Sequence, residues 1–129
     1  MTEKNGLAGK VALVTGAGRY RGIGRAIALR LARDGANVVV SARPRDPATF
    51  PQHEQDMGWQ GAESVAAEIR DMGREAIALP CDVTELTQVQ AMIDNIEEHF
   101  GRLDIIVNNA GVPSMAGSSP ILDTDEEVW

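Results

Sequence analysis

Lys10–Gly24 reads KVALVTGAGRYRGIG, and this stretch decides the fold. It begins with a short apolar run, Val11–Val14, which is typical of a strand buried on both faces in a parallel sheet. Four glycines then occur within nine residues, at positions 16, 18, 22 and 24. Ile23, Ile27 and Leu31 recur every four residues, which predicts a helix with one apolar face.

A strand, a glycine-rich turn and a helix in this order form the context of a dinucleotide-binding loop. The start of a helix offers a diphosphate unpaired N–H groups and the positive end of the helix dipole. Glycines let the backbone approach the phosphates without a Cβ atom in the way. The alternative is that these glycines only form a tight turn. The flanking strand and helix favour the binding loop.

The rest of the chain continues the alternation of apolar strands and amphipathic helices. A helix is expected to begin at Thr84 or Thr87, where Thr87 and Gln90 have the spacing of a capping box, and another at Asp123 or Thr124. Strand, helix and strand within about 30 residues form one βαβ unit. The predicted strands are 10–15, 37–42, 75–80 and 103–107, and the predicted helices before residue 101 are 22–33, 62–72 and 84–100 or 87–100.

Composition narrows the class of protein. The chain has 129 residues, enough for one domain, and its net charge of −7 argues against a nucleic-acid partner. The single cysteine, Cys81, excludes an internal disulfide and suits a reducing compartment. No apolar run approaches the roughly 20 residues of a membrane span, and residues 1–9 lack the apolar core of a signal peptide. We therefore expect a cytoplasmic protein without a membrane partner.

The motif VTG followed by GIG resembles the cofactor loop of the short-chain dehydrogenase/reductase family, which reads T-G-x-x-x-G-x-G. Five residues, Ala17–Arg21, separate Gly16 from Gly22, where the family has three. Either the loop carries two extra residues, or the motif starts at Gly18 after a longer strand end. The insertion is preferred because KVALVTG keeps the family's strand-to-turn junction. The resemblance implies cofactor contacts in this loop from Gly16, Gly18, Arg21, Gly22, Ile23 and Gly24.

The end of the second predicted strand indicates the cofactor. Many NAD-binding sites place an acid here for the ribose hydroxyls, whereas a nearby arginine accommodates a 2′-phosphate. This chain has Arg43 after the strand and no acid before Asp46. A guanidinium binds phosphate in bidentate fashion, so we favour NADP over NAD, with Arg43 as the phosphate contact. Arg19 and Arg21 are candidates to assist, and the alternative for Arg43 is a solvated loop residue.

Residues 44–61, PRDPATFPQHEQDMGWQG, resemble an insertion relative to the family. Prolines at 44, 47 and 51 forbid a continuous helix. This long loop follows the adenosine end of the predicted site, so it is a candidate to cover the cofactor, to bind a partner or to form an ordered surface loop. Phe50 and Trp59 are expected to anchor it by packing. A metal site at His53 is not favoured, because metal ligands must converge and only one histidine is near.

Two later motifs extend the resemblance. Asp82 and Val83 follow the third strand, and the resemblance implies that they contact the adenine, although an Asp here is also a common turn former. Residues 108–111 read NNAG after the fourth strand. The resemblance implies that Asn108 ties the central sheet together. It also implies that Asn109, Ala110 and Gly111 line the cofactor; the alternative is a plain turn.

The family's catalytic motif has no match in this chain. Its hydride transfer uses a tyrosine and a lysine spaced Y-x-x-x-K, with a serine and an upstream asparagine. The lysine lowers the pKa of the tyrosine, which exchanges a proton with the substrate. The sole tyrosine is Tyr20 and the last lysine is Lys10, so no catalytic residue is assigned.

The resemblance implies an α/β fold of the Rossmann type: a doubly wound parallel sheet of four strands in the order 3-2-1-4, with helices on both faces. We expect residues 1–129 to be one incomplete NAD(P)-binding domain, inactive alone and homo-oligomeric only within a complete chain. Two functions remain open. One is the cofactor-binding half of an NADP-dependent oxidoreductase acting on an alcohol or carbonyl substrate. The other is a non-catalytic dinucleotide-binding or interaction module.

Overall fold

The structure is a computed structural model that describes residues 6–111. The helix expected from Asp123 or Thr124 lies outside the described residues.

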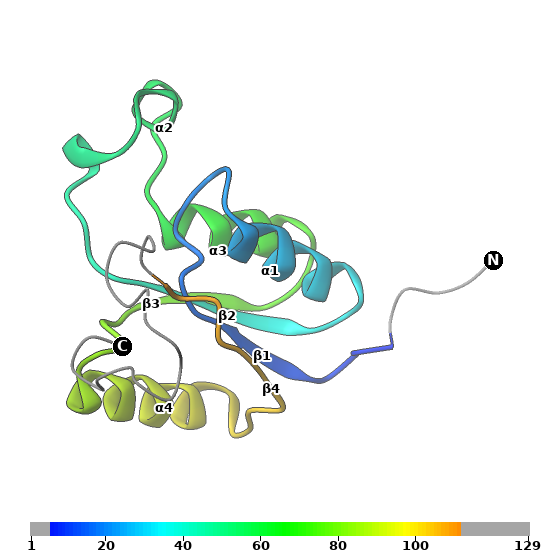
Figure 1. Cartoon of the computed structure of the whole chain (residues 1–129). Helices are drawn as coiled ribbons and strands as arrows, with labels where there is room; N and C mark the ends of the chain where they lie inside the picture. Colours follow the sequence, from blue (N-terminus) through cyan, green and yellow to red (C-terminus); the bar gives the residue numbers. More distant parts are fainter. Residues whose placement is uncertain (1–5, 112–129) are drawn as a thin grey trace, which may run out of the picture.

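A parallel sheet of four strands forms the centre of the fold (Figure 1). The strands are β1 (Val11–Val14), β2 (Asn37–Ala42), β3 (Ala76–Pro80) and β4 (Ile105–Val107). They lie in the order β3-β2-β1-β4, which confirms the predicted order. Val14 pairs with Val40 on one side and with Val107 on the other, so three strands end at the same edge of the sheet.

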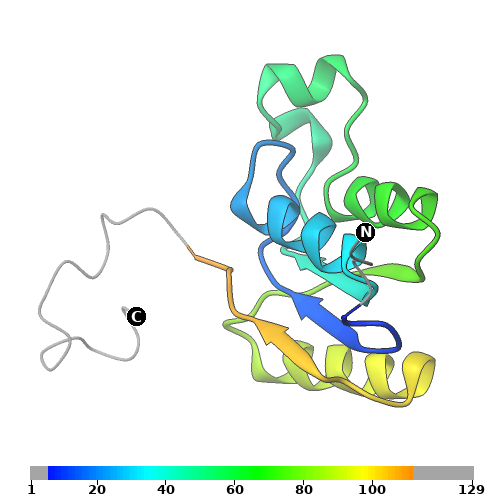
Figure 2. The same cartoon turned by 90° about the vertical axis from the view of Figure 1, so that its right-hand side faces the viewer.

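Helices cover both faces of the sheet (Figures 1 and 2). The helices α1 (Ile23–Arg33) and α3 (Ala62–Asp71) lie on one face, and α4 (Leu86–Phe100) lies on the other. Successive side chains of a strand point to opposite faces of the sheet, so apolar side chains of each strand reach both helical layers. Val14 and Val40 pack in the core of the α1 and α3 face, whereas Leu13 packs with Met92 and Ile96 of α4.

The helix α4 begins differently from the prediction. Its first residue is Leu86 and its N-cap is Glu85, without a side-chain capping bond. The capping box starting at Thr87 is therefore wrong. The other candidate, Thr84, directs its hydroxyl to Asp82 and closes the preceding turn. The helix ends as expected at Phe100, and its C-cap, Gly101, has the left-handed conformation.

Residues 44–61 contain two short helices and no continuous one, as the prolines predict. These are η1 (Pro47–Thr49) and α2 (Gln52–Asp56). Figure 1 shows this segment projecting beside the loop that joins β1 to α1. Trp59 is buried and Phe50 is half-buried against the same core, which confirms the packing of both. No helix within residues 6–111 is long and apolar enough to cross a membrane.

Candidate dinucleotide-binding site

The glycine loop crosses the edge where β1, β2 and β4 end. The Ala17 N–H donates to the Ser41 carbonyl at 3.0 Å, and the Thr15 N–H donates to the Val107 carbonyl at 3.2 Å. Gly16 has φ +66°, and a Cβ atom there would lie 2.7 Å from Ala110 Cα. Only glycine fits both the left-handed backbone and this close approach.

The start of α1 packs equally closely on the loop. A Cβ atom on Gly24 would lie 2.7 Å from Asn109 Nδ2 and 2.8 Å from the Gly16 carbonyl oxygen. The third glycine of the motif therefore serves close packing of helix on strand end. Between Gly16 and Gly24 the lengthened part of the loop forms a turn, in which the Gly22 N–H donates to the Arg19 carbonyl at 3.3 Å. The positive φ of Gly16, two residues after the end of β1, favours the insertion over the alternative register.

The first turn of α1 is arranged to receive an anion. Gly22 is its N-cap and provides no side-chain capping bond, and no acidic residue lies in the turn. The first N–H groups of a helix have no intrahelical acceptor, so the amides here keep their positive partial charge. Ile23 is 72% exposed at the same point, an unusual position for a large apolar side chain. Glycines, amides without an intrahelical acceptor and an exposed apolar side chain thus meet at one place among the described residues.

The NNAG motif is joined to the glycine loop by hydrogen bonds around Thr15. The buried Thr15 hydroxyl accepts the N–H groups of Asn109 and Ala110, at 3.2 and 3.1 Å. The Asn109 Nδ2 donates to the carbonyl oxygens of Thr15 and Gly16, at 3.2 and 3.1 Å. Within residues 6–111, Asn109 makes these bonds and Asn108 is exposed, so a role of Asn108 in tying the sheet together stays a prediction. The loop and the strand end form one hydrogen-bonded unit.

Arg43, Asp82 and Val83 form a second group at the ends of β2 and β3. The Cys81 N–H donates to the Ala42 carbonyl at 3.1 Å, which places the residues after the two strands side by side. Val83 is 45% exposed. The hydroxyl and amide of Thr84, and more weakly the charge of Arg43, lower the pKa of Asp82. Asp82 is thus a turn former, with bonds of 2.7 and 3.0 Å to Thr84, that lies beside an arginine.

The arginines near the loop differ in their partners. Arg19 pairs with Glu54 at 3.2 Å, and Arg25 forms a two-pronged pair with Glu68 at 2.8 and 2.7 Å. The hydrogen bond to Glu68 raises the pKa of Arg25. Arg21 and Arg43 are exposed. Arg19 is therefore held by a carboxylate, whereas Arg21 and Arg43 face solvent near the predicted cofactor.

Gly18, Gly111 and Cys81 are the remaining residues that the sequence singled out. Gly18 lies over the end of β2, where a Cβ atom would be 2.9 Å from Ala42 Cβ. Gly111, the last residue that the structure describes, is exposed. Cys81 is buried, and burial raises the pKa of its thiol, which agrees with a packing role. Residues 6–111 contain no group of three or more potential metal ligands.

Sequence reasoning did not identify Thr15 and Glu54. Thr15 had a local signal, since it directly precedes the glycine that turns the chain at the strand end. Glu54 had none, because it lies in a short polar helix and is nevertheless completely buried. Its partners are 34 and 35 residues away in the sequence.

Comparisons with known proteins agree with this arrangement. A sequence model of the family described as "short chain dehydrogenase" matches residues 10–129. The chain is 45% identical over 121 residues to the short chain dehydrogenase/reductase AacuN of Aspergillus aculeatus, covering 94% of this chain and 39% of the relative. It is 38% identical over 119 residues to the hydroxynaphthalene reductase-like protein Arp2 of Metarhizium acridum, covering 92% of this chain and 39% of the relative. The chain therefore spans about 39% of the length of these curated relatives.

Solved structures of dehydrogenases are also similar to this chain in fold. The hydroxysteroid dehydrogenase of Escherichia coli is similar with a TM-score of 0.69 and 34% identity, covering 95% of this chain and 46% of that one. The short-chain type dehydrogenase/reductase of Mycobacterium marinum is similar with a TM-score of 0.66 and 36% identity, covering 94% of this chain and 41% of that one.

Proposed function

This chain belongs to the short-chain dehydrogenase family, and on that premise we propose that it is the cofactor-binding portion of an NADP-dependent oxidoreductase. The complete enzyme would transfer hydride between the nicotinamide cofactor and an alcohol or carbonyl substrate. The observation that carries the proposal is the first turn of α1. There, uncapped amides adjoin two glycines, Gly16 and Gly24, whose positions exclude any side chain.

The diphosphate would bind at this first turn. Backbone amides near Gly22 and Gly24 would donate to it, since a helix start favours anions. Gly16 and Gly18 would let it approach the loop. The exposed Ile23 would provide an apolar contact, and Asn109, Ala110 and Gly111 would line the adjoining ribose. When bound, the nicotinamide supplies the hydride or accepts it.

The second group would bind the adenosine end. Arg43 would contact the 2′-phosphate of NADP, with Arg21 in support, because both residues are exposed, Arg43 directly after β2 and Arg21 in the glycine loop. Asp82 and Val83 would contact the adenine by hydrogen bonding and packing. Arg19 has no part in phosphate binding in this proposal, because Glu54 already neutralises it.

Tyr20 is the only tyrosine, and its surroundings assign it to packing. Its ring lies edge-on to Trp59 with centroids 5.2 Å apart, and the Arg25 guanidinium lies 4.5 Å from its centroid. We therefore propose that this chain alone does not reduce carbonyl substrates with NADPH. Measurable NADPH consumption with a panel of carbonyl compounds would contradict this. Binding without turnover would also be expected of the alternative, a dinucleotide-binding module.

Replacing Arg43 tests the choice of cofactor. The unmodified chain should bind NADPH more tightly than NADH in calorimetric titrations. Arg43→Asp should reverse this order, because an added carboxylate repels a 2′-phosphate and accepts ribose hydroxyls; the ratio of the two affinities should change by about tenfold or more.

Arg33→Asp is the matched control, since it makes the same charge change at the far end of α1. It should leave the ratio unchanged. An Arg43→Asp chain that keeps the original preference would refute the role of Arg43.

A further inference from the structure

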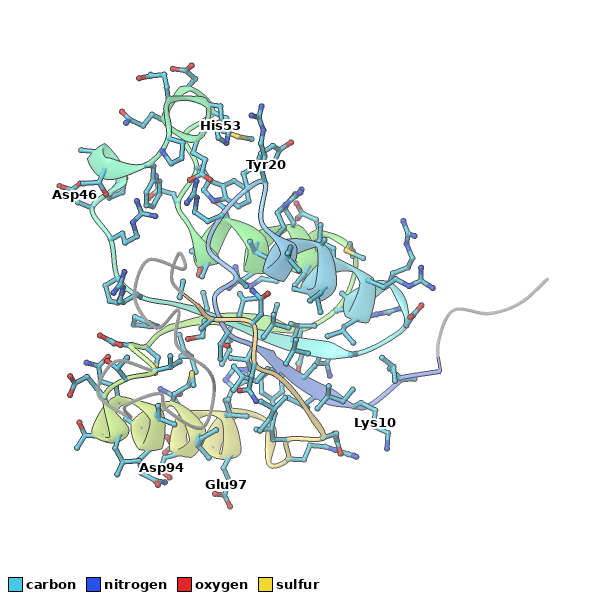
Figure 3. All side chains as sticks on the ribbon, viewed as in Figure 1. Lys10, Tyr20, Asp46, His53, Asp94 and Glu97 are labelled. Atoms are coloured by element: carbon cyan, nitrogen blue, oxygen red, sulfur yellow. The ribbon has the colours of Figure 1, made fainter. Side chains whose placement is uncertain are left out.

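The inserted segment, residues 44–61, contacts the glycine loop directly. Figure 3 shows His53 of this segment close to Tyr20 of the loop, and their ring centroids are 6.5 Å apart. The loop itself is two residues longer than the family motif. The two departures from the family pattern therefore meet in space.

Glu54 is the centre of this contact. It is fully buried, and its Oε2 accepts the Tyr20 N–H at 3.0 Å and the Arg19 Nε–H at 3.2 Å. A buried carboxylate is costly unless it is paired and hydrogen-bonded. Arg19 and Tyr20 provide both forms of compensation at Oε2, whereas Oε1 has no hydrogen-bond partner among the described residues. Both partners belong to the lengthened part of the loop. The conformation of the loop is thus tied to the position of this carboxylate.

Trp59 makes a second, independent tie. Its side chain is 6% exposed, and its Nε1–H donates to the Gly18 carbonyl at 2.8 Å. A buried indole N–H requires an acceptor, so the carbonyl of Gly18 is held in one direction. The inserted segment therefore holds the glycine loop at three consecutive residues, Gly18, Arg19 and Tyr20.

We infer that the inserted segment is a clip that fixes the glycine loop in the shape that receives the diphosphate. Glu54 and Trp59 are its positioning residues, and this inference rests on the dinucleotide-binding function proposed above. Because the diphosphate is common to both cofactors, loosening the clip weakens NADPH and NADH binding by the same factor. Arg43 sets the preference between them, and Glu54 does not.

Three variants test the clip in the full chain. Glu54→Ala removes both bonds to the loop and should raise the dissociation constants of NADPH and NADH about tenfold. Glu54→Gln should raise them less, because its amide oxygen can still accept the Tyr20 N–H. Trp59→Phe keeps a ring and loses the bond to Gly18, so about a threefold rise is expected. If Glu54→Ala fails to fold, the other two variants decide.

The matched control is Glu63→Gln, which breaks an ion pair of 2.8 Å with Arg70 on α3 and leaves the loop untouched. It should leave both dissociation constants unchanged. All constants are measured well below each variant's unfolding temperature. A purely structural role would lower that temperature and leave binding at wild-type strength, so this pattern overturns the clip.

Two further results would also overturn it. A Glu54 variant that changes the NADPH-to-NADH ratio would show that Arg19, once released, contacts the 2′-phosphate. A wild-type chain that binds neither dinucleotide would remove the proposed function and the clip together. Because that last result appears without any variant, it is distinguishable from failure of the clip alone.

Discussion

The strands β1 and β4 are joined by side chains at both of their ends, and the two ends use different chemistry. At the amino end, Asp104 Oδ2 accepts the Val11 N–H at 2.9 Å, and Arg102 pairs with both carboxylate oxygens at 2.7 and 2.8 Å. At the carboxyl end, the neutral side chains of Thr15 and Asn109 make the connection. One end is an exposed ion pair and the other is a neutral, partly buried network.

This difference follows from what each end has to do. An exposed charged tie can stabilise a strand pair where nothing else binds. A carboxylate at the other end would repel the diphosphate proposed to bind there, whereas a hydroxyl and an amide shape the loop without adding charge. Changes at the carboxyl end should therefore affect ligand binding, and changes at the amino end should affect stability alone.

The largest effect is expected from Gly24→Val. The added side chain would meet Asn109 Nδ2 and the Gly16 carbonyl oxygen inside normal contact distance. Both the helix start and the loop must move, so the free energy of unfolding should fall by about 1–3 kcal/mol and dinucleotide binding by about a hundredfold. Chemical denaturation and calorimetric titration measure the two. Gly6→Val is the control, since nothing lies within 4 Å of its Cβ position.

Thr15→Val should have a smaller effect. The change keeps the shape of the side chain but leaves the amides of Asn109 and Ala110 without their acceptor. The free energy of unfolding should fall by about 2 kcal/mol, and both dinucleotides should bind several-fold more weakly, with their ratio unchanged. Asp104→Asn, at the opposite end of the same strand pair, should leave both affinities intact. An equal loss of dinucleotide binding in Thr15→Val and Asp104→Asn would contradict the proposed difference between the two ends of the strand pair.

The smallest effect concerns pH at the amino end. Hydrogen bonds from Arg102 and from the Val11 amide lower the pKa of Asp104 to about 2. An unfolded Asp has a pKa of about 3.9. The stabilisation by Asp104 is therefore complete above about pH 4 and is lost as the pH falls towards 2.

Urea denaturation between pH 5 and pH 2 checks this. Asp104→Asn should be less stable than the wild type at pH 5, and the difference should shrink at about pH 2. Asp71→Asn removes an exposed carboxylate at the end of α3 and serves as the control. A stability difference between the wild type and Asp104→Asn that stays constant from pH 5 to pH 2 would contradict the stabilising role of the Asp104 carboxylate.

The positions of the strands and the start of α1 could be predicted because their signals are local, whereas the strand order was implied by the family resemblance. Short apolar runs, glycine positions and four-residue spacing do not depend on distant contacts. The bonds from Asn109 to the glycine loop could not, because a shift of one residue in an extended segment turns a side chain to the other face. The burial of Glu54 could not either, since its partners come from a loop elsewhere in the sequence and acids are rarely buried.

The central claim is that the first turn of α1 binds the diphosphate of a nicotinamide dinucleotide. The most direct test is a titration of the ¹⁵N-labelled chain with NADPH, followed through backbone amide chemical shifts. The largest changes are expected at the amides of Gly16, Gly18 and Gly22–Gly24, with saturation at one common dissociation constant. Saturable changes confined to other regions, such as α4, with these glycine amides unmoved, would contradict it.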